Sequence, residues 1–248
     1  MENLNLVIDL HKDQQRQGPG GNRETKLAIE LSGIKNHSGL KIADIGCGTG
    51  ASALILAKEL QASIIAVDIA TEFLDKLHKK AIEHGVSDRI ITMTSPMEEL
   101  PFVENQLDVI WGEGSIYNMG FENGIKYWKN FLKEDGILAI SEITWLTDER
   151  PQEIEDYWNT QYGEINTASR KMMVLEKNGF SPIGYFPLPD YCWKENYYNP
   201  LVSSFDDFIR RHTDIVAAAE IVKQERSEIE LYHKFNKYFG YGFYIARK

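Results

Sequence analysis

A glycine-rich loop that follows an acidic residue is the strongest chemical signal in the chain. Gly46, Gly48 and Gly50 stand at alternate positions, and Asp44 lies two residues before the first of them. The apolar run 41–45 is typical of a buried strand, and apolar residues recur at helical spacing after the loop. Glycine permits positive φ and lets a ligand approach main-chain atoms that a Cβ would block. We therefore expect a ligand-binding loop between a strand and a helix.

The spacing of the glycines and the charge beside them indicate which ligand this loop binds. In the dinucleotide-binding fingerprint, the third glycine follows the second by three residues and the loop seats a diphosphate at a helix N-terminus. Here Gly50 follows Gly48 by two residues. The carboxylate of Asp44 would repel a diphosphate but attract a ligand with ammonium and sulfonium groups. The loop therefore favours a cationic nucleoside over a dinucleotide.

A second acid, Asp68, ends the next predicted strand, residues 63–68, and lies 22 residues after Gly46. A carboxylate at this place in an α/β unit accepts hydrogen bonds from ribose hydroxyls. The structural alternative is an acid that caps a helix or lies on the surface. Its place at the strand end favours ribose binding.

A third acid, Glu113, follows the fourth predicted strand, residues 107–112. Where the first and fourth strands are neighbours, ligand groups meet at the carboxyl ends of both. Glu113 could hold a cofactor ammonium, orient a substrate or serve as a general base, and a solvated loop acid is the alternative. Tyr117 is a second catalytic candidate close by, and Asn118 lies next to it.

These residues resemble the class I S-adenosylmethionine-dependent methyltransferases. The Asp-x-Gly-x-Gly-x-Gly loop, the acid Asp68, the run 98–102 and the strand at 107–110 occur in that family's order, over roughly residues 40–145. Within the family, the chain looks most like the small-molecule branch that includes ubiquinone and menaquinone C-methyltransferases and natural-product methyltransferases. The resemblance implies S-adenosylmethionine as the cofactor. It is expected to contact Asp44, Gly46, Cys47, Gly48, Gly50, Asp68, Ile69, Met97, Glu98 and Glu113.

The sequence departs from this family at the adenine position. Family members often carry an acid there that accepts from the adenine amino group, whereas this chain has Pro96, which has no accepting side chain and no backbone N–H. Met97 could pack on the adenine ring, and Glu98 could replace the missing acid. The Asn/Asp-Pro-Pro-aromatic motif of enzymes that act on nucleobase or amide nitrogen is replaced by Glu113-Gly114-Ser115-Ile116.

The chain alternates strands and helices, which predicts an α/β fold with a doubly wound, mostly parallel sheet in one domain, residues 1–248. A helix is expected at 25–35. Residues 1–23, with the turn-rich run 17–21, are expected to be a linker or an N-terminal lid. The predicted strands are 41–45, 63–68, 89–94, 107–112, 136–144, 181–188 and 241–246. The resemblance implies a Rossmann-like sheet of seven strands whose last strand is antiparallel and inserted beside the fifth, and it assigns the helical insertion 189–239 to a substrate cap.

Aromatic residues are concentrated downstream of the cofactor half. All 12 Tyr and all 5 Trp follow residue 110. Flat amphipathic side chains can line a pocket for an apolar or ring-bearing acceptor, and packing of the cap against the sheet is the alternative for each. The predicted acceptor pocket is made of Trp145, Tyr191, Trp193, Tyr197 and Tyr198.

Composition limits the class of protein. The net charge is −10, with 27 basic and 37 acidic residues and no basic run, so we expect no nucleic-acid partner. The N-terminus shows no signal-peptide pattern and no stretch is apolar enough for a membrane span, which predicts a cytoplasmic location. Cys47 and Cys192 are expected to be free thiols, and the scattered histidines predict no metal site.

The sequence therefore predicts transfer of a methyl group from S-adenosylmethionine to O, C or N of a small, partly apolar metabolite. In-line methyl transfer needs alignment and exclusion of water rather than a covalent nucleophile. An NAD-dependent oxidoreductase and a non-catalytic S-adenosylmethionine-binding module are the alternatives. Apolar helical faces in the insertion could also serve a homodimer.

Overall fold

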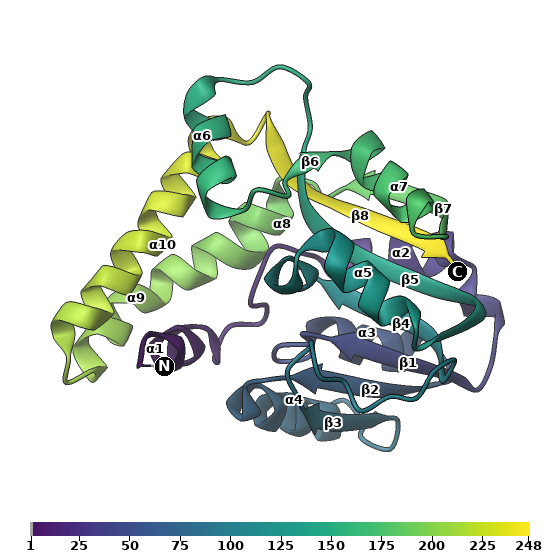
Figure 1. Cartoon of the computed structure of the whole chain (residues 1–248). Coiled ribbons are helices and arrows are strands. Elements are labelled where there is room, and N and C mark those ends of the chain that lie inside the picture. The colour runs from purple at the N-terminus through teal and green to yellow at the C-terminus, as the bar shows by residue number, and fades with distance from the viewer. Residues whose placement is uncertain (1) are drawn as a thin grey trace.

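The computed structural model describes residues 2–248, and side-chain packing from residue 4 onward. Its centre is one sheet in the order β3-β2-β1-β4-β5-β8-β7, with a short strand β6 paired to β5 off this path (Figure 1). The strands are β1 Leu40–Ile45, β2 Ala62–Asp68, β3 Ile90–Thr94, β4 Leu107–Glu113, β5 Leu132–Trp145, β6 Asn166–Thr167, β7 Ser181–Pro187 and β8 Phe239–Arg247. All seven predicted strands are confirmed.

The first five strands of the chain are parallel to one another, and β1 lies between β2 and β4. Asp44 pairs in register with Ala66 on one side and with Trp111 on the other. The strand order reverses at β1 and β4, so their carboxyl ends border a crevice in which α/β proteins bind ligands. The glycine loop begins at this crevice.

The last strand, β8, lies between β5 and β7 in the sheet. β8 runs antiparallel to β5 and to β7, with Ile140 opposite Tyr244 in the first pairing and Phe186 opposite Phe243 in the second. The predicted antiparallel last strand beside the fifth is confirmed. Consequently β7 is joined to the parallel strands only through β8.

Strand β5 begins earlier than the predicted range 136–144. Leu132 pairs with Leu107, and the register shifts before Val109 pairs with Ile137. Asp135 has a φ of 62° inside this irregular stretch. A residue with positive φ interrupts the alternation of side chains, which is why the pattern indicated only the regular part of the strand.

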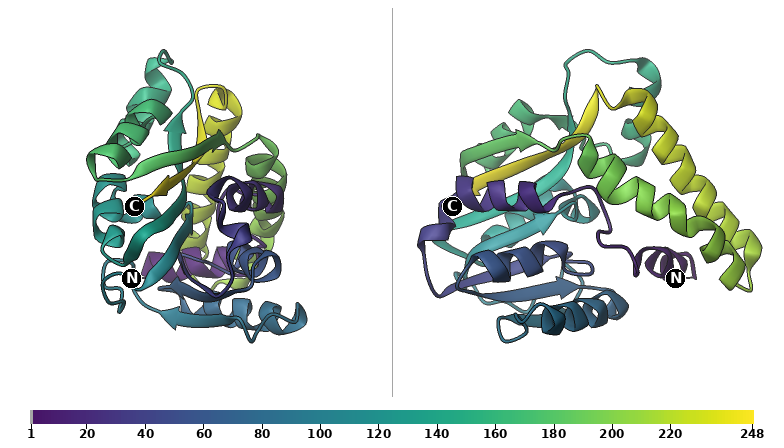
Figure 2. Two further views of the ribbon diagram at one scale, coloured as in Figure 1. Left: turned by 90° about the vertical axis from the view of Figure 1, so that its right-hand side faces the viewer. Right: turned by 180° about the vertical axis from the view of Figure 1, so that it is seen from behind.

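Helices cover both faces of the sheet (Figures 1 and 2). α2, α3 and α4 pack in one apolar cluster with one face, and α5 and α7 pack in a second cluster with the other. Their bounds are α2 Asn22–Ser32, α3 Ala51–Glu59, α4 Thr71–Glu83, α5 Phe121–Lys129 and α7 Ala168–Lys177. The buried stripe of α4, Leu74, Leu77 and Ala81, shows how i, i+3 and i+7 spacing directs one side of a helix to the sheet.

Helix α2 begins and ends three residues before the predicted helix 25–35. It ends at Gly33, whose φ is 73° and whose N–H donates to the carbonyl of Glu30. Helices commonly end at a glycine in the left-handed region, so Gly33 ends this helix. The predicted range 25–35 did not take this glycine into account. A short 3₁₀ turn, η1 Ile34–Asn36, follows it.

The N-terminal segment, for which a linker or a lid is expected, contains helix α1, Glu2–His11. Leu10 is 2% exposed on the inner side of this helix, and Leu6 and Val7 pack against the same apolar cluster. The spacing of these three residues suits one helix face. The turn-rich run 17–21 connects α1 to α2.

The segment between β7 and β8 is helical, as predicted, with α8 Tyr191–Trp193, the π-helical turn η3 Lys194–Tyr198, α9 Asn199–Arg211 and α10 Ile215–Phe235. α9 and α10 project together from the sheet as an arm, and α1 packs against both of them (Figures 1 and 2). α6, Gln152–Gln161, lies before β6 and α7. None of the helices within residues 2–248 has the length and apolar content needed to cross a membrane.

Candidate functional site

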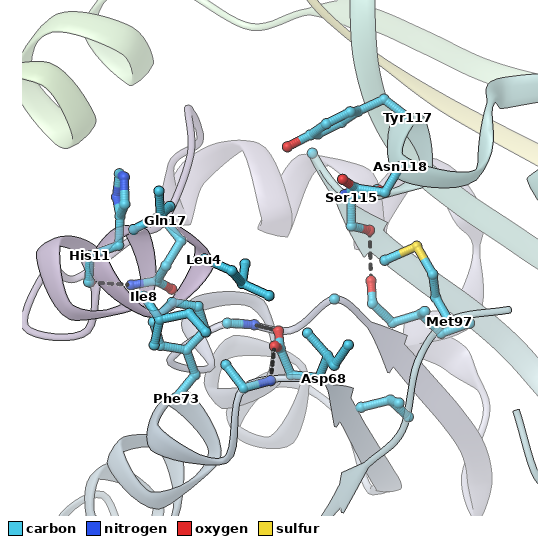
Figure 3. Close-up of a pocket in the computed structure, with 18 of the residues that line it drawn as sticks. Leu4, Ile8, His11, Gln17, Asp68, Phe73, Met97, Ser115, Tyr117 and Asn118 are labelled. Carbon is cyan, nitrogen blue, oxygen red and sulfur yellow. Dashed lines mark hydrogen bonds between the residues drawn. The ribbon is translucent and has the colours of Figure 1, made fainter. Parts of the chain in front are cut away.

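A cavity of about 530 Å³ lies where the carboxyl ends of β1, β2 and β4 face α1 and the arm (Figure 3). Its wall includes the glycine loop, the end of β2, the segment 95–98 after β3, and the turn η2 Ile116–Met119. Side chains of α1, η3 and α10 complete it on the other side. Its volume is in the range of about 300–1,000 Å³ that is usual for small-molecule sites.

The glycine loop lies at the wall of this cavity. Gly46 and Gly48 line the cavity and have φ of 72° and 54°, and Gly50 has a φ of 86°. A Cβ on Gly46 would lie 2.4 Å from the Cβ of Ser115, and a Cβ on Gly48 would lie 2.3 Å from Oε1 of Gln17. Only glycine satisfies both the dihedral angles and the space. The predicted loop residues therefore have a structural reason as well as a functional one.

Gln17 connects the glycine loop to the N-terminal helix. Its Oε1 accepts a hydrogen bond of 2.8 Å from the N–H of Thr49, and its Nε2 donates to the carbonyl of His11 over 3.1 Å. Gln17 also lines the cavity. Gln17 lies in the turn-rich run 17–21, and no pattern in the sequence distinguishes it as a site residue.

Asp68 lies at the cavity wall, at the end of β2. Its Oδ2 accepts from the N–H of Gly48 over 2.8 Å and its Oδ1 accepts from the N–H of Ala70 over 2.9 Å. Burial raises the pKa of Asp68, and these two N–H donors oppose the increase. Each oxygen keeps one acceptor site, so ribose hydroxyls can still donate to this carboxylate.

Asp44 lies fully buried beneath the loop. Its Oδ2 accepts from Ser52 Oγ over 2.6 Å, whereas its Oδ1 has no hydrogen-bond partner in the described part of the chain. Burial, with smaller contributions from the charges of Glu113 and Asp68, raises the pKa of Asp44 to about 7. A buried, half-satisfied carboxylate of this kind suits a cationic ligand group.

Both carboxylate oxygens of Glu113 accept hydrogen bonds from other side chains of the protein. Its Oε2 accepts from Arg16 Nη1 over 2.8 Å, and its Oε1 accepts from Thr25 Oγ1 over 2.6 Å and from Trp111 Nε1 over 3.1 Å. The side chains of Arg16 and Glu113 are each 9% exposed. Because an Arg neutralises it, Glu113 lacks the free carboxylate that the role of general base requires.

Arg16 and Glu113 also border a small hollow of about 70 Å³ beside the glycine loop. Cys47 and Ser52 lie in its wall, and Gly46 and Gly48 belong to both this hollow and the larger cavity. Burial raises the pKa of Cys47 well above its usual value, so its thiol stays protonated. Cys47 and Cys192 are both free, as predicted.

The predicted adenine-contact residues lie together on the cavity wall. Ile69, Met97 and Glu98 line it with Pro96, and Ile69 is 58% exposed. The carbonyl of Met97 accepts a hydrogen bond of 3.4 Å from Trp128 Nε1, which holds the segment after β3 in place. The structure therefore brings these side chains to one side of the glycine loop.

The predicted acceptor pocket is only partly correct. Among its five aromatic residues, Tyr197 lines the cavity. Trp145, Trp193 and Tyr198 are buried in the apolar cluster of the arm and β8, and Tyr191 donates to Glu24 Oε1. The rings of Trp145, Trp193 and Tyr198 contact one another or Tyr232 and Phe239, and these contacts pack the insertion against the sheet. Tyr117 projects into the cavity from η2 (Figure 3).

Several cavity residues were not predicted from the sequence. His11 comes from α1, Phe73 from α4, and Glu225 and Glu228 from α10. The two glutamates are three residues apart on a helix, a spacing that places them on one face, but this pattern alone also fits a solvated surface. Within residues 2–248, no group of three or more His, Cys, Asp or Glu side chains is placed to hold a metal ion.

Comparison with known proteins agrees with this geometry. Residues 42–136 match a family model described as a methyltransferase domain. This segment, which contains the glycine loop, Asp68, Met97 and Glu113, is similar to methyltransferase domains.

Among characterised relatives, 27-O-demethylrifamycin SV methyltransferase of Amycolatopsis mediterranei is 27% identical over 121 residues. The alignment covers 48% of this chain and 44% of that protein. The matched part of the chain therefore spans less than half the length of this relative.

Solved structures extend the likeness to the whole chain. An S-adenosylmethionine-dependent methyltransferase from Geobacter sulfurreducens, in complex with S-adenosyl-L-homocysteine, superposes with a TM-score of 0.84 and 15% identity over 99% of this chain and 97% of that chain. The cyclase SpnF superposes with a TM-score of 0.73 and 23% identity over 92% of this chain and 81% of that chain. These superpositions confirm the predicted fold class. Because a cyclase shares the fold, the reaction must be argued from the site.

Proposed function

We propose that this protein transfers a methyl group from S-adenosylmethionine to O, C or N of a small, partly apolar acceptor. The observation that carries the proposal is that Gly46 and Gly48 of the glycine loop and the acid Asp68 line one cavity, with the carboxylate of Asp44 buried directly beneath the loop. When bound, S-adenosylmethionine supplies a methyl carbon activated by a positively charged sulfur.

The residues of the chain fit this cofactor on two structural grounds. Gly46 and Gly48 line the cavity, and with no Cβ they let Ser115 and Gln17 pack close to the loop at the cavity wall. Asp44 Oδ1 is buried without a partner, and a nearby ammonium group would satisfy it. We assign Asp68 to the ribose hydroxyls, Ile69, Met97 and Glu98 to the adenine, and Arg16 and Glu113 to the polar end of the methionine group.

The rest of the cavity aligns the acceptor and excludes water. We assign α1 and the run to residue 23 to a lid, because Leu4, Ile8 and His11 close the cavity on one side. We assign 189–239 to a substrate cap, since Tyr197 and the α10 glutamates close it on another. Exclusion of water and alignment of the two reactants are what in-line methyl transfer needs from the protein.

The first experiment compares thermal stabilisation of the protein by S-adenosylmethionine, S-adenosyl-L-homocysteine and NAD. Stabilisation by the first two and not by NAD is expected, and the reverse would establish the oxidoreductase alternative. Incubation with methyl-labelled donor and a metabolite extract then tests transfer. Tight donor binding without any labelled product would favour the non-catalytic module.

Two finer predictions are part of this proposal. The first is that the acceptor is of the kind implied by the resemblance to ubiquinone and menaquinone C-methyltransferases. The second is that the protein assembles as a homodimer, and size-exclusion chromatography with light scattering tests this directly.

A further inference from the structure

The part of the cavity that faces the arm is acidic. Four carboxylates line the whole cavity, Asp68 and Glu98 on the side proposed for the nucleoside and Glu225 and Glu228 on α10. Among the lining residues that the structure describes, none is Lys or Arg. A cavity with one sign of charge and partly apolar walls attracts ligands of the opposite sign.

Glu225 and Glu228 lie one helical turn apart and each has an unused oxygen. Glu228 Oε1 accepts from the hydroxyl of Tyr198 over 3.0 Å, and Glu225 Oε1 lies 3.5 Å from Nε2 of His11. No residue within 2–248 donates a hydrogen bond to Oε2 of either glutamate. Two acceptor atoms therefore remain for a ligand.

His11 provides a third acceptor independently of this acidic pair. It is 5% exposed, it lines the cavity, and its Nδ1 is buried without a hydrogen-bond partner in the described part of the chain. Because Nε2 faces Glu225, the ring proton belongs on Nε2 and Nδ1 is left as an acceptor. Figure 3 shows the ring projecting from α1 at the cavity wall. A ligand that donates N–H groups would satisfy it.

Aromatic rings accompany these acceptors. Tyr197 stacks on His11 with ring centroids 6.0 Å apart and an interplanar angle of 18°. Tyr117 lines the same cavity from η2 and projects into it (Figure 3). Ring faces attract organic cations, and they also contact the methylene groups that carry them.

We propose that the acceptor is a small organic amine that binds as its ammonium cation to Glu225, Glu228 and His11. The proposal rests on the methyltransferase function proposed above and names its substrate class. An acidic acceptor would meet two carboxylates without a counterion, and a neutral one would leave them unpaired. Burial, followed by the charge of Glu225, raises the pKa of Glu228 to about 7, and a bound cation would relieve this repulsion.

Calorimetric titrations with matched probes test recognition without any turnover. Ethylamine, butylamine and 2-phenylethylamine are compared with ethanol, butanol and 2-phenylethanol, and with 3-phenylpropanoate, on protein saturated with S-adenosyl-L-homocysteine. We expect at least one amine to bind at least tenfold more tightly than its alcohol, with no binding of the carboxylate. Equal affinity for an amine and its alcohol, binding of the carboxylate, or no saturable binding of any amine would overturn the proposal.

Variants test which residues bind the amine. The double variant Glu225→Gln, Glu228→Gln should lose at least tenfold in amine affinity and keep its affinity for S-adenosyl-L-homocysteine within twofold. Glu230→Gln, an exposed acid on the same helix, is the matched control and should bind amines like the unchanged protein. Amine affinity retained in the double variant would overturn this assignment alone. Failure of the unchanged protein to bind the nucleoside would instead overturn the proposed methyl transfer.

Discussion

Arg16 Nη1 donates to Glu113 Oε2 over 2.8 Å, and this pair joins the segment after α1 to the end of β4. Both side chains are 9% exposed, so neither charge is well solvated without the other. Removal of one partner leaves a buried charge, which typically costs about 3–5 kcal/mol. The pair therefore couples the position of the N-terminal segment to the stability of the whole domain.

Arg16→Met should lower the free energy of unfolding by about 3 kcal/mol, because Glu113 is left unpaired. Urea denaturation measures this change. The double variant Arg16→Met, Glu113→Gln should recover part of the loss, since no buried charge remains. An Arg16→Met protein as stable as the unchanged one would show that the pair does not contribute.

Asp68→Ala should weaken binding of S-adenosylmethionine at least tenfold. Each charge-assisted hydrogen bond to ribose is worth about 1.5–3 kcal/mol, and the variant also removes the acceptor for the Gly48 N–H. Titration calorimetry measures the affinity, and a thermal scan checks that the protein stays folded. Unchanged affinity would remove Asp68 from the proposed site.

Gly48→Ala should also weaken donor binding, because its Cβ would lie 2.3 Å from Oε1 of Gln17 and would displace this side chain, which accepts from the N–H of Thr49 and lines the cavity. Gly85→Ala is the matched control, since Gly85 has a φ of 66° but nothing within 4 Å of its Cβ position. Both substitutions carry a backbone cost of roughly 1–2 kcal/mol. Only Gly48→Ala should lose donor affinity, so equal losses would argue against the close approach at the loop.

Asp44 makes stability depend on pH. Its pKa is about 7 in the folded protein against 3.8 as the ordinary value, so between these values the folded state binds a proton that the unfolded state lacks. The free energy of unfolding should therefore fall as pH rises through this window, by on the order of 4 kcal/mol at most. Urea titrations between about pH 5 and about pH 8 measure the slope. Asp44→Asn should make the slope less steep, with Glu228, whose pKa is also raised to about 7, contributing to the remainder, and an unchanged slope would contradict the assignment.

The lid assignment predicts faster donor release when α1 is loosened. Asp9 on α1 accepts from Arg211 Nε over 2.9 Å and lies 2.9 Å from His212 Nε2. Exposed pairs contribute about 0.2–1 kcal/mol, so Asp9→Asn should raise the dissociation rate of S-adenosylmethionine up to about fivefold in stopped-flow experiments. Asp207→Asn, which removes pairs within α9, should leave this rate unchanged. A greater effect of the Asp207 variant would contradict the lid.

Local patterns in the sequence were sufficient to predict the strands of the sheet and the residues on the side of the cavity proposed for S-adenosylmethionine. The strands are short apolar runs, and the acids Asp44 and Asp68 lie beside glycines at readable spacings. The acceptor side could not be predicted, because His11 and Glu228 come from opposite ends of the chain and meet only in the tertiary structure. For the same reason the pairing of Arg16 with Glu113 was missed. Trp145 and Trp193 were assigned to the pocket because aromatic content does not tell which way a ring points.

The placement of β8 has a consequence for synthesis of the protein. Within the described residues β7 pairs with β8 alone, and α10 immediately precedes that strand. During synthesis on the ribosome, the glycine loop is therefore complete long before β7 gains a partner. A premature stop codon within β8 would leave that loop intact, yet it would remove the strand through which β7 joins the sheet.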